Sequence, residues 1–215
     1  GEIDVLDEIQ NWFNSLQSKD FPPEMLTEIT QQRKQTKMII GIDHGNRNMK
    51  TANTVFSAAI QPLQARPDSL EHILEYQNQF YYVGGKVPEK ECVDKTDNEN
   101  YYLLTLAALA QEMRRMLIEK LHAHGGHAGP NFGFVEATIA LHTVFNSPVD
   151  KFVFDVSHQT YPHKMLTGRM EAFADPAHYD DVSGYSEPGE SPHDHFIIGH
   201  TSTSISLAAG LAKAR

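Results

Sequence analysis

Hydrophobic residues change their spacing along the chain, and the first spacing predicts helices. Within residues 1–37 they recur at helical intervals at Leu6, Ile9, Trp12, Phe13 and Leu16, and again at Met25, Leu26 and Ile29. Apolar residues three and four positions apart are typical of an amphipathic helix, and Pro22-Pro23 opens the second run. The segment therefore predicts two helices whose apolar faces suit packing or a partner.

From Met38 the apolar residues fall in short runs broken by glycine and asparagine, which predicts β-hairpins. One is MIIGIDHGNRNMKTANTVF, and another is EHILEYQNQFYYVGG, with its turn around Gln77-Asn78. A long helix follows, because NYYLLTLAALAQEMRRMLIEKLHAH is rich in helix-forming residues and has few breakers. Asp97 or Asn98 suits the N-cap position of that helix.

From Gly125 onward, loops rich in glycine and histidine separate apolar segments. GGHAGPNFG predicts a loop, FVEATIALHTVF a helix, KFVFDVS a buried strand over Phe152–Val156, and HKMLTGR a short helix or turn. The pattern repeats as the polar loop YDDVSGYSEPGESPHD, the strand-like FIIG and the helical STSISLAAGLAKAR. Helices that alternate with apolar strands are typical of an open parallel α/β sheet, where ligands bind at the carboxyl ends of strands.

Composition and charge narrow the function classes. The net charge of -10 and the pI near 5.6 argue against a nucleic-acid surface, which needs clustered lysine and arginine. Cys92 is the only cysteine, so no internal disulfide forms and no oxidising compartment is indicated. No apolar run approaches the roughly 18 residues of a membrane span. We therefore expect a cytoplasmic protein that binds neither nucleic acid nor membrane.

Three motifs stand in order in the second half of the chain: GGHAGPNFG, DVSHQTYPHKMLTGR and GHTSTS. The segment that contains them, residues 106–215, resembles the N-terminal pyrophosphate-binding domain of 1-deoxy-D-xylulose-5-phosphate synthases, which are transketolase-like thiamine-diphosphate enzymes. The resemblance implies thiamine diphosphate with Mg²⁺, transfer of a two-carbon unit from pyruvate to an aldose phosphate, a role in isoprenoid biosynthesis and a homodimer. Ser157 stands where much of the family has glycine, as in a synthase-like subgroup.

The same resemblance implies roles for residues of the three motifs. It gives His127 and His158 catalytic roles, and cofactor contacts to His200, Ser202, Thr203 and Gly129. It gives His163, Lys164 and Arg169 either contacts with an anionic substrate or the task of fixing their loop.

Two other interpretations of these histidines stay open. One is a set of histidines that are hydrogen-bonded inside loops. The other is a zinc site built from HAHGGH or SPHDH. Neither segment has the regular i, i+4 spacing of a zincin helix, and no cysteine lies nearby.

The resemblance also implies partners that this sequence does not contain. Family members bind the magnesium ion through a GDG motif and a later asparagine, and a glutamate from a second domain contacts the aminopyrimidine ring. None of these follows GHTSTS here. If Arg215 is the true end, we expect a chain that holds part of a cofactor pocket and does not turn over alone.

Residues 38–112 carry a second resemblance. MIIGIDHGNRNMKTANTVF, with the segments after it, resembles the start of actin-like ATPases of plasmid segregation, whose first phosphate loop lies on a β-hairpin. The resemblance implies an ATP and Mg²⁺ site at Asp43, Gly45, Asn46, Asn48 and Lys50. A plain structural hairpin accounts for the same residues without any ligand.

Taken together, the sequence predicts an α/β chain in three parts. Residues 1–37 form a helical segment, 38–105 a β-hairpin-rich module, and 106–215 a partial thiamine-diphosphate-binding domain with a parallel sheet. The two resemblances meet between Leu103 and Met113 inside one predicted helix, which indicates a fused, misassembled or engineered reading frame, or an insertion. The alternatives to a transketolase-like enzyme fragment are an actin-like filament protein and a non-catalytic composite chain.

Overall fold

The computed structural model describes residues 3–4, 40–45, 47–68, 72–76, 78–84 and 99–214. They fall into two compact units, and the division lies within helix α3, Glu99–His124, between Glu112 and Met113. The long predicted helix is thus confirmed. The helices predicted at Leu6–Leu16 and Met25–Ile29 lie outside the described residues, although Ile3–Asp4 is a short strand and not helix.

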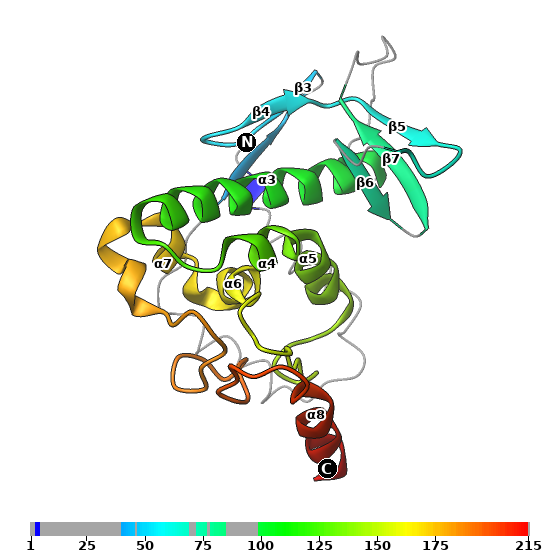
Figure 1. The fold of residues 1–215 in the computed structure, drawn as a ribbon. Coiled ribbons are helices and arrows are strands. Elements are labelled where there is room, and N and C mark those ends of the chain that lie inside the picture. Colours follow the sequence, from blue (N-terminus) through cyan, green and yellow to red (C-terminus); the bar gives the residue numbers. More distant parts are fainter. Residues whose placement is uncertain are drawn as a thin grey trace, which may run out of the picture. The chain divides into compact units, whose positions relative to one another are not determined.

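The first unit holds two antiparallel sheets (Figure 1). One has the order β1 (Ile3–Asp4), β2 (Gly41–His44), β3 (Asn48–Lys50), β4 (Val55–Ser57). The other has the order β5 (Ile60–Leu63), β7 (Gln79–Val83), β6 (Ile73–Tyr76). Both predicted hairpins are confirmed, with Asp43 opposite Lys50 in one and Tyr76 opposite Gln79 in the other.

Side chains of the first sheet reach residues of α3 that belong to the same unit. Met49 is fully buried, whereas its neighbours Asn48 and Lys50 are exposed, which is the period-two pattern of a half-buried strand. Beyond the strand, Asn53 donates to the buried Glu112 at 3.3 Å, and Thr51 also donates to that carboxylate. A buried carboxylate needs such donors, so these bonds fix the loop after β3.

The second unit is built from short helices that follow the end of α3 (Figure 1). In chain order they are α4 (Ala128–Phe132), α5 (Val135–Val144), α6 (Tyr161–Lys164), η1 (Met165–Arg169), α7 (Glu171–Ala174), η2 (Pro176–Asp181) and α8 (Ser204–Lys213). The helices predicted from FVEATIALHTVF, HKMLTGR and STSISLAAGLAKAR are confirmed. The loop predicted at GGHAGPNFG was wrong in part, because α4 forms within it.

The parallel sheet predicted for this unit is not formed. Every described strand pair is antiparallel, and no strand lies within residues 99–214. The segments predicted as strands, Phe152–Val156 and Phe196–Gly199, have no ladder partner among the described residues, and a strand's N–H and C=O groups need one. The first segment also ends in a tight turn: Val156 and Ser157 have φ angles of 58° and 67°, and Ser157 N–H donates to Asp155 O at 2.5 Å. The broader prediction of a mixed α and β chain holds.

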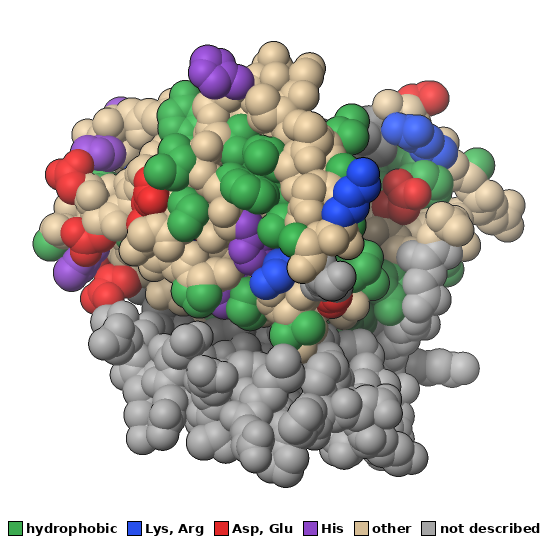
Figure 2. Space-filling model, turned by 90° about the horizontal axis from the view of Figure 1, so that it is seen from below, with side chains coloured by type: hydrophobic (Ala, Val, Ile, Leu, Met, Phe, Trp, Pro, Cys, Tyr) green, Lys and Arg blue, Asp and Glu red, His purple; other side chains and the backbone are tan. Residues whose placement is uncertain are grey.

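The core of the second unit surrounds Phe173, Met113 and Leu117, which have no exposed surface. Helix α8 has no buried residue, and Ile205 on it keeps 82% of its surface exposed. Figure 2 shows hydrophobic side chains gathered in the middle of the face seen from below.

None of the helices in the described part of the chain combines the length and apolar character needed to cross a membrane.

Candidate functional site

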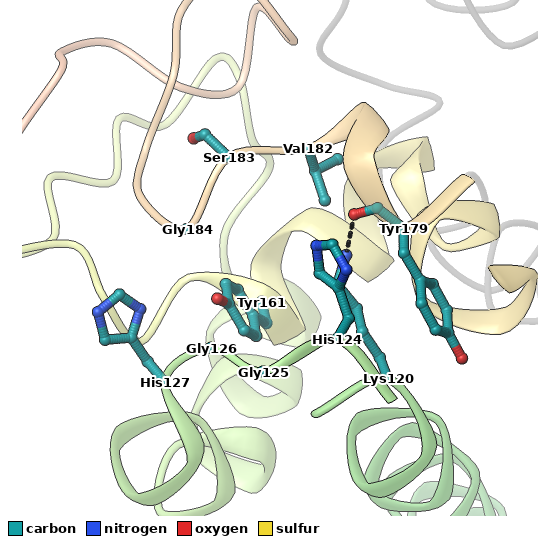
Figure 3. A pocket seen from close by; sticks show the side chains of 10 residues that line it. All are labelled: Lys120, His124, Gly125, Gly126, His127, Tyr161, Tyr179, Val182, Ser183 and Gly184. Carbon is teal, nitrogen blue, oxygen red and sulfur yellow. Dashed lines mark hydrogen bonds between the residues drawn. The ribbon is translucent and has the colours of Figure 1, made fainter. Parts of the chain in front are cut away.

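A cavity of about 250 Å³ opens in the second unit where α3 ends (Figure 3). Its lining residues come from the end of α3, the glycine turn, α6, η2 and the segment after η2: Lys120, His124, Gly125, Gly126, His127, Tyr161, Tyr179, Val182, Ser183 and Gly184. This volume is slightly below the roughly 300 Å³ at which small-molecule sites begin. The cavity therefore suits a phosphate group, a small acid or one part of a larger cofactor.

The glycine turn brings the chain from α3 into the cavity wall. Gly125 and Gly126 have φ angles of 83° and 128°, in the region that only glycine adopts without strain. A Cβ atom on Gly126 would lie 2.7 Å from the Tyr161 hydroxyl oxygen and 3.0 Å from a methyl carbon of Leu121. Backbone conformation therefore favours glycine at both positions, and lack of space also requires it at Gly126.

His127 and His158, both predicted as catalytic, lie together. Their rings meet edge to face, with centroids 5.5 Å apart and planes at 88°. The Nδ1 atom of each ring is buried and has no hydrogen-bond partner in the protein. Since buried polar atoms are almost always paired, two such nitrogens on neighbouring rings indicate a place for ligand or water.

Two aromatic residues complete the surroundings of His127. The ring of Tyr185 lies 5.0 Å from that of His127, centroid to centroid. The Tyr161 hydroxyl group is turned to the His127 side of the cavity in Figure 3. Burial raises the pKa of Tyr161, although the backbone N–H of His127 acts in the opposite direction. Tyr161 therefore stays a neutral hydroxyl group near pH 7, able to donate and to accept.

Lys120 forms the opposite wall and is largely occupied by the protein. Its Nζ donates to the carbonyl oxygens of Ala172 at 2.8 Å and Tyr179 at 2.7 Å, and it lies 4.5 Å from the centroid of the Phe173 ring. Burial lowers the pKa of Lys120 to about 8, with a further lowering from the charge of Lys164. Lys120 therefore joins α3 to α7 and η2, and it adds positive charge beside the cavity near neutral pH.

The cofactor contacts predicted for the third motif lie away from the cavity lining. His200 and Ser202 are exposed, and the hydroxyl group of Thr203 donates to His200 O at 3.0 Å. The backbone N–H groups of Ser202 and Thr203 donate to the carboxylate of Asp155 at 3.0 and 3.1 Å. The bonds from the GHTSTS turn, that from Ser202 foremost, lower the pKa of Asp155.

Gly129, the remaining predicted cofactor residue, lies in α4, and nothing lies within 4 Å of the place where its Cβ would be. Backbone could approach a ligand there without hindrance. This position is close in sequence to His127 but does not line the cavity.

The predicted substrate residues instead form an internal ionic network. Lys164 is fully buried and lies 2.5 Å from Glu190 Oε2, while Arg169 makes a bidentate pair with Asp194 at 2.7 and 2.9 Å. His163 Nε2 lies 3.3 Å from the same aspartate. Each residue thus has a partner in the segment before GHTSTS. Of the two roles that the sequence left open, this geometry favours fixing the loop.

Burial sets the charge state of this network. It lowers the pKa of Lys164 and that of His163, and the adjacent carboxylates act against the shift. The Arg169 guanidinium and His163 hold the pKa of Asp194 well below its usual range, against its own burial. The aspartate is therefore ionised and His163 is neutral near pH 7.

The zinc interpretation has no geometric basis in the described part of the chain. No group of three or more histidine, cysteine, aspartate or glutamate side chains is arranged there to hold a metal ion. Histidines from HAHGGH make separate contacts: His124 lies 3.1 Å from Asp180, whereas His127 contacts His158.

The predicted nucleotide residues lie on the β2–β3 hairpin of the first unit. Asp43 and Lys50 pair at 3.4 Å with both side chains at least half exposed, and Asn48 is exposed. A Cβ on Gly45 would lie 2.4 Å from Asn48 O, so the tight turn itself requires that glycine. Asn46 lies outside the described residues. These contacts account for the motif as a structural hairpin.

Comparisons with known proteins place the second half of the chain in one family. The family model of 1-deoxy-D-xylulose-5-phosphate synthase matches residues 91–215, more than half of the sequence, and the chain belongs to this family. The match includes residues 91–112, which the actin-like interpretation had claimed. That interpretation gains no support from these comparisons.

Curated relatives agree with the family model. Proteins named 1-deoxy-D-xylulose-5-phosphate synthase from Symbiobacterium thermophilum and Macrococcus caseolyticus are 54% and 56% identical over 110 residues, which are 51% of this chain and 17% and 18% of theirs. The protein of that name from Chlamydia felis is 51% identical over 120 residues, 55% of this chain and 19% of its own. The chain therefore spans about a fifth of the length of the relatives it matches.

Sequence reasoning missed three residues that shape the site. Tyr161 and Lys120 line the cavity, and Asp155 binds the GHTSTS turn. Tyr161 and Asp155 stand inside the DVSHQTYPHKMLTGR motif that was noted for its histidines, so their polar groups next to His158 were a usable signal. Nothing in the sequence distinguished Lys120 in this way, because it is one of several polar residues on a long predicted helix.

Proposed function

We propose that this chain forms part of the cofactor and substrate site of a thiamine-diphosphate-dependent transferase, which moves a two-carbon unit from pyruvate to an aldose phosphate. The observation that carries the proposal is the buried, unpartnered Nδ1 atom of His127, which lines the cavity, together with that of His158, whose ring contacts the ring of His127 but does not line the cavity. Membership of the synthase family and the names of the relatives supply the reaction class.

The residues present fit such a ligand. His127 and His158 would hold it through their two Nδ1 atoms, and Tyr161 would offer a neutral hydroxyl group. When bound, thiamine diphosphate supplies the carbon nucleophile for the two-carbon transfer. Imidazoles of this kind donate or accept a proton with little rearrangement, so we assign proton transfer at the reacting oxygen atoms to the histidine pair.

The finer parts of this proposal are Mg²⁺ at the diphosphate, a homodimer as the active form and a cytoplasmic location. The domain assignment follows the same line: residues 106–215 serve as the pyrophosphate-binding part. Four residues outside the cavity lining remain proposed cofactor contacts: His200, Ser202, Thr203 and Gly129. Three others are proposed to fix the polar loop before GHTSTS: His163, Lys164 and Arg169.

A thermal-shift titration of the chain tests the proposal. Thiamine diphosphate with Mg²⁺ should raise Tm in a saturable manner, because a ligand at about 100 times its Kd stabilises a protein by about 2.7 kcal/mol. His158→Ala should abolish the rise. His122→Ala, which removes an exposed histidine of α3, is the matched control and should retain it.

ATP with Mg²⁺ is titrated in parallel. A rise with ATP alone that Asp43→Ala removes would replace the proposal with the nucleotide site on the hairpin. A rise with thiamine diphosphate that survives in both His127→Ala and His158→Ala would place the ligand elsewhere and overturn the assignment of the histidine pair.

A further inference from the structure

Asn131 is a fully buried polar residue next to the two histidines. It lies in α4, four residues after His127, and its side chain has no exposed surface. A buried amide is costly unless all of its donors and acceptors are used. The question is which groups of the protein satisfy it.

The Asn131 side chain binds backbone groups of three residues of the site. Its Nδ2 donates to His127 O at 2.6 Å and to His158 O at 2.8 Å, and its Oδ1 accepts from Tyr161 N–H at 2.9 Å. The orientation of the amide is therefore fixed, since the opposite one would set Oδ1 against two carbonyl oxygens. Both side-chain N–H groups and the oxygen are used.

These bonds connect chain segments that are about 30 residues apart in sequence. His127 begins the α4 segment, whereas His158 and Tyr161 belong to the second motif. The edge-to-face contact of the two imidazoles at 5.5 Å depends on how these segments are aligned, and Asn131 joins the backbone of each. Only an amide of this length offers two donors and one acceptor here, because aspartate lacks the donors and leucine lacks all three.

We propose that Asn131 is the positioning residue that holds His127 and His158 as one unit, so that their two Nδ1 atoms serve a single ligand. The alignment of the histidines stands on the bonds just described. Only the identity of the ligand rests on the proposed function, and the experiment reads the two separately.

NMR of the whole chain with labelled histidines, recorded without ligand, tests the positioning role. The wild type should show a cross-relaxation peak between the ring protons of His127 and His158. Asn131→Leu, which keeps the branching at Cγ and removes all three bonds, should lose that peak and shift the signals of both rings. Thr138→Val is the matched control, because Thr138 of α5 is also fully buried and donates to the O atom of Phe134, the N-cap residue of that helix, at 2.7 Å. It should retain the peak at a comparable loss of Tm.

A measurement on the wild type keeps the proposal testable even if Asn131→Leu does not fold. Both side-chain amide protons of Asn131 should exchange slowly with solvent, as in a doubly donating buried group. Fast exchange, or a histidine cross-peak unchanged in Asn131→Leu, would overturn the proposal.

Ligand binding is then read on the same samples. Two results together support both the positioning role and the ligand. The cross-peak is lost in Asn131→Leu, and the concentration of thiamine diphosphate that gives half of the maximal rise in Tm is about tenfold higher in this variant than in the wild type. If the cross-peak depends on Asn131 but no thiamine diphosphate response exists even in the wild type, the positioning role stands and the proposed ligand fails.

Discussion

Lys164 Nζ lies 2.5 Å from Glu190 Oε2, and the lysine side chain has no exposed surface. The same carboxylate oxygen accepts from Arg169 at 3.0 Å, and the other accepts from Ser183 N–H at 2.6 Å. A glutamate in the polar loop thus holds two cations of the second motif. Because these cations are buried with their partners, the network connects the loop to α6 and η1.

Removing Lys164 should take away one of the two cations that Glu190 holds and leave Arg169 as the other. Lys164→Met is therefore expected to lower the free energy of unfolding by about 1–3 kcal/mol, which is less than the cost of leaving a buried charge with no partner. Urea unfolding followed by circular dichroism measures this change. The double variant Lys164→Met with Glu190→Gln should lose less than the sum of the two single variants, because the residues share one interaction.

Lys151→Met serves as the control for this prediction. Lys151 is exposed and donates only to Pro148 O in its own turn, so its loss should change stability by less than about 0.5 kcal/mol. Equal effects at both lysines would contradict a structural role for the Lys164–Glu190 pair.

Gly126 and Gly129 stand close together in the first motif but have different surroundings. Gly126→Ala should destabilise the chain by roughly 1–3 kcal/mol, because φ is 128° and the new Cβ would meet the Tyr161 hydroxyl oxygen at 2.7 Å. Gly129→Ala adds a methyl group in α4 with nothing within 4 Å, so Tm should stay equal or rise slightly. A comparable loss of Tm in both variants would contradict the difference predicted between the two positions.

The variant at Gly129 also tests its predicted cofactor role. If the backbone there approaches the cofactor, Gly129→Ala should weaken the response to thiamine diphosphate while Tm of the free protein is kept. A response equal to that of the wild type would remove Gly129 from the site.

Local patterns in the sequence predicted local structure well. The hairpins around Gly45 and Asn78, α3 and α5 each depend on residues close together in the chain, and they are confirmed. The strands predicted at Phe152–Val156 and Phe196–Gly199 depended on a partner strand elsewhere. Period and hydrophobicity give no information on whether such a partner is present, and these predictions were wrong.

The site was predictable only through family motifs. They led to His127 and His158, which do lie together. They did not show that Arg169 binds Asp194, 25 residues further on, because a basic residue next to histidines reads equally well as a substrate contact. Which charged residues pair across loops depends on the tertiary structure, and a single sequence does not indicate it.

Acid should destabilise the second unit through His142. Burial, with a further effect of nearby His163 and His193, lowers the pKa of His142 to about 3. The folded state therefore binds fewer protons than the unfolded state below the ordinary pKa of about 6.5. Stability is fully present above that pH and falls by up to about 1.4 kcal/mol for each unit on the way down to about 3.

Other groups bear on this dependence. Burial also lowers the pKa of His163 and of His195, so both act in the same direction as His142. His178 has a raised pKa because Asp181 accepts from it, so it adds stability at acid pH, but it is exposed and its effect is screened. The lowered pKa of Asp194 matters only below its unfolded value near 4. Urea unfolding at about pH 7, 6 and 5 should show a decline that His142→Phe reduces and His122→Ala leaves unchanged. A flat profile in the wild type would contradict the burial effect.

Ser157 combines a strained backbone with two useful bonds. Its φ of 67° is a conformation that costs a non-glycine residue about 1 kcal/mol. Its buried hydroxyl group donates to Ile198 O at 2.7 Å and accepts from Ser186 N–H at 3.0 Å. The side chain thereby connects the turn before His158 to Ser186 inside the polar loop and to Ile198 after it, and the bonds offset the strain.

The relative stabilities of two substitutions at position 157 separate the effect of backbone strain from that of the lost hydrogen bonds. Ser157→Ala keeps the strain and leaves two buried backbone groups unpaired, so it should cost about 1–3 kcal/mol. Ser157→Gly loses the same bonds but relieves the strain, and it should be about 1 kcal/mol more stable than the alanine variant. Ser206 in α8 provides the opposite case, because alanine is favoured over glycine by about 1 kcal/mol within a helix. Chemical denaturation of the four variants measures both orders. If alanine is the more stable replacement at position 157 as well, the left-handed conformation of Ser157 does not limit stability.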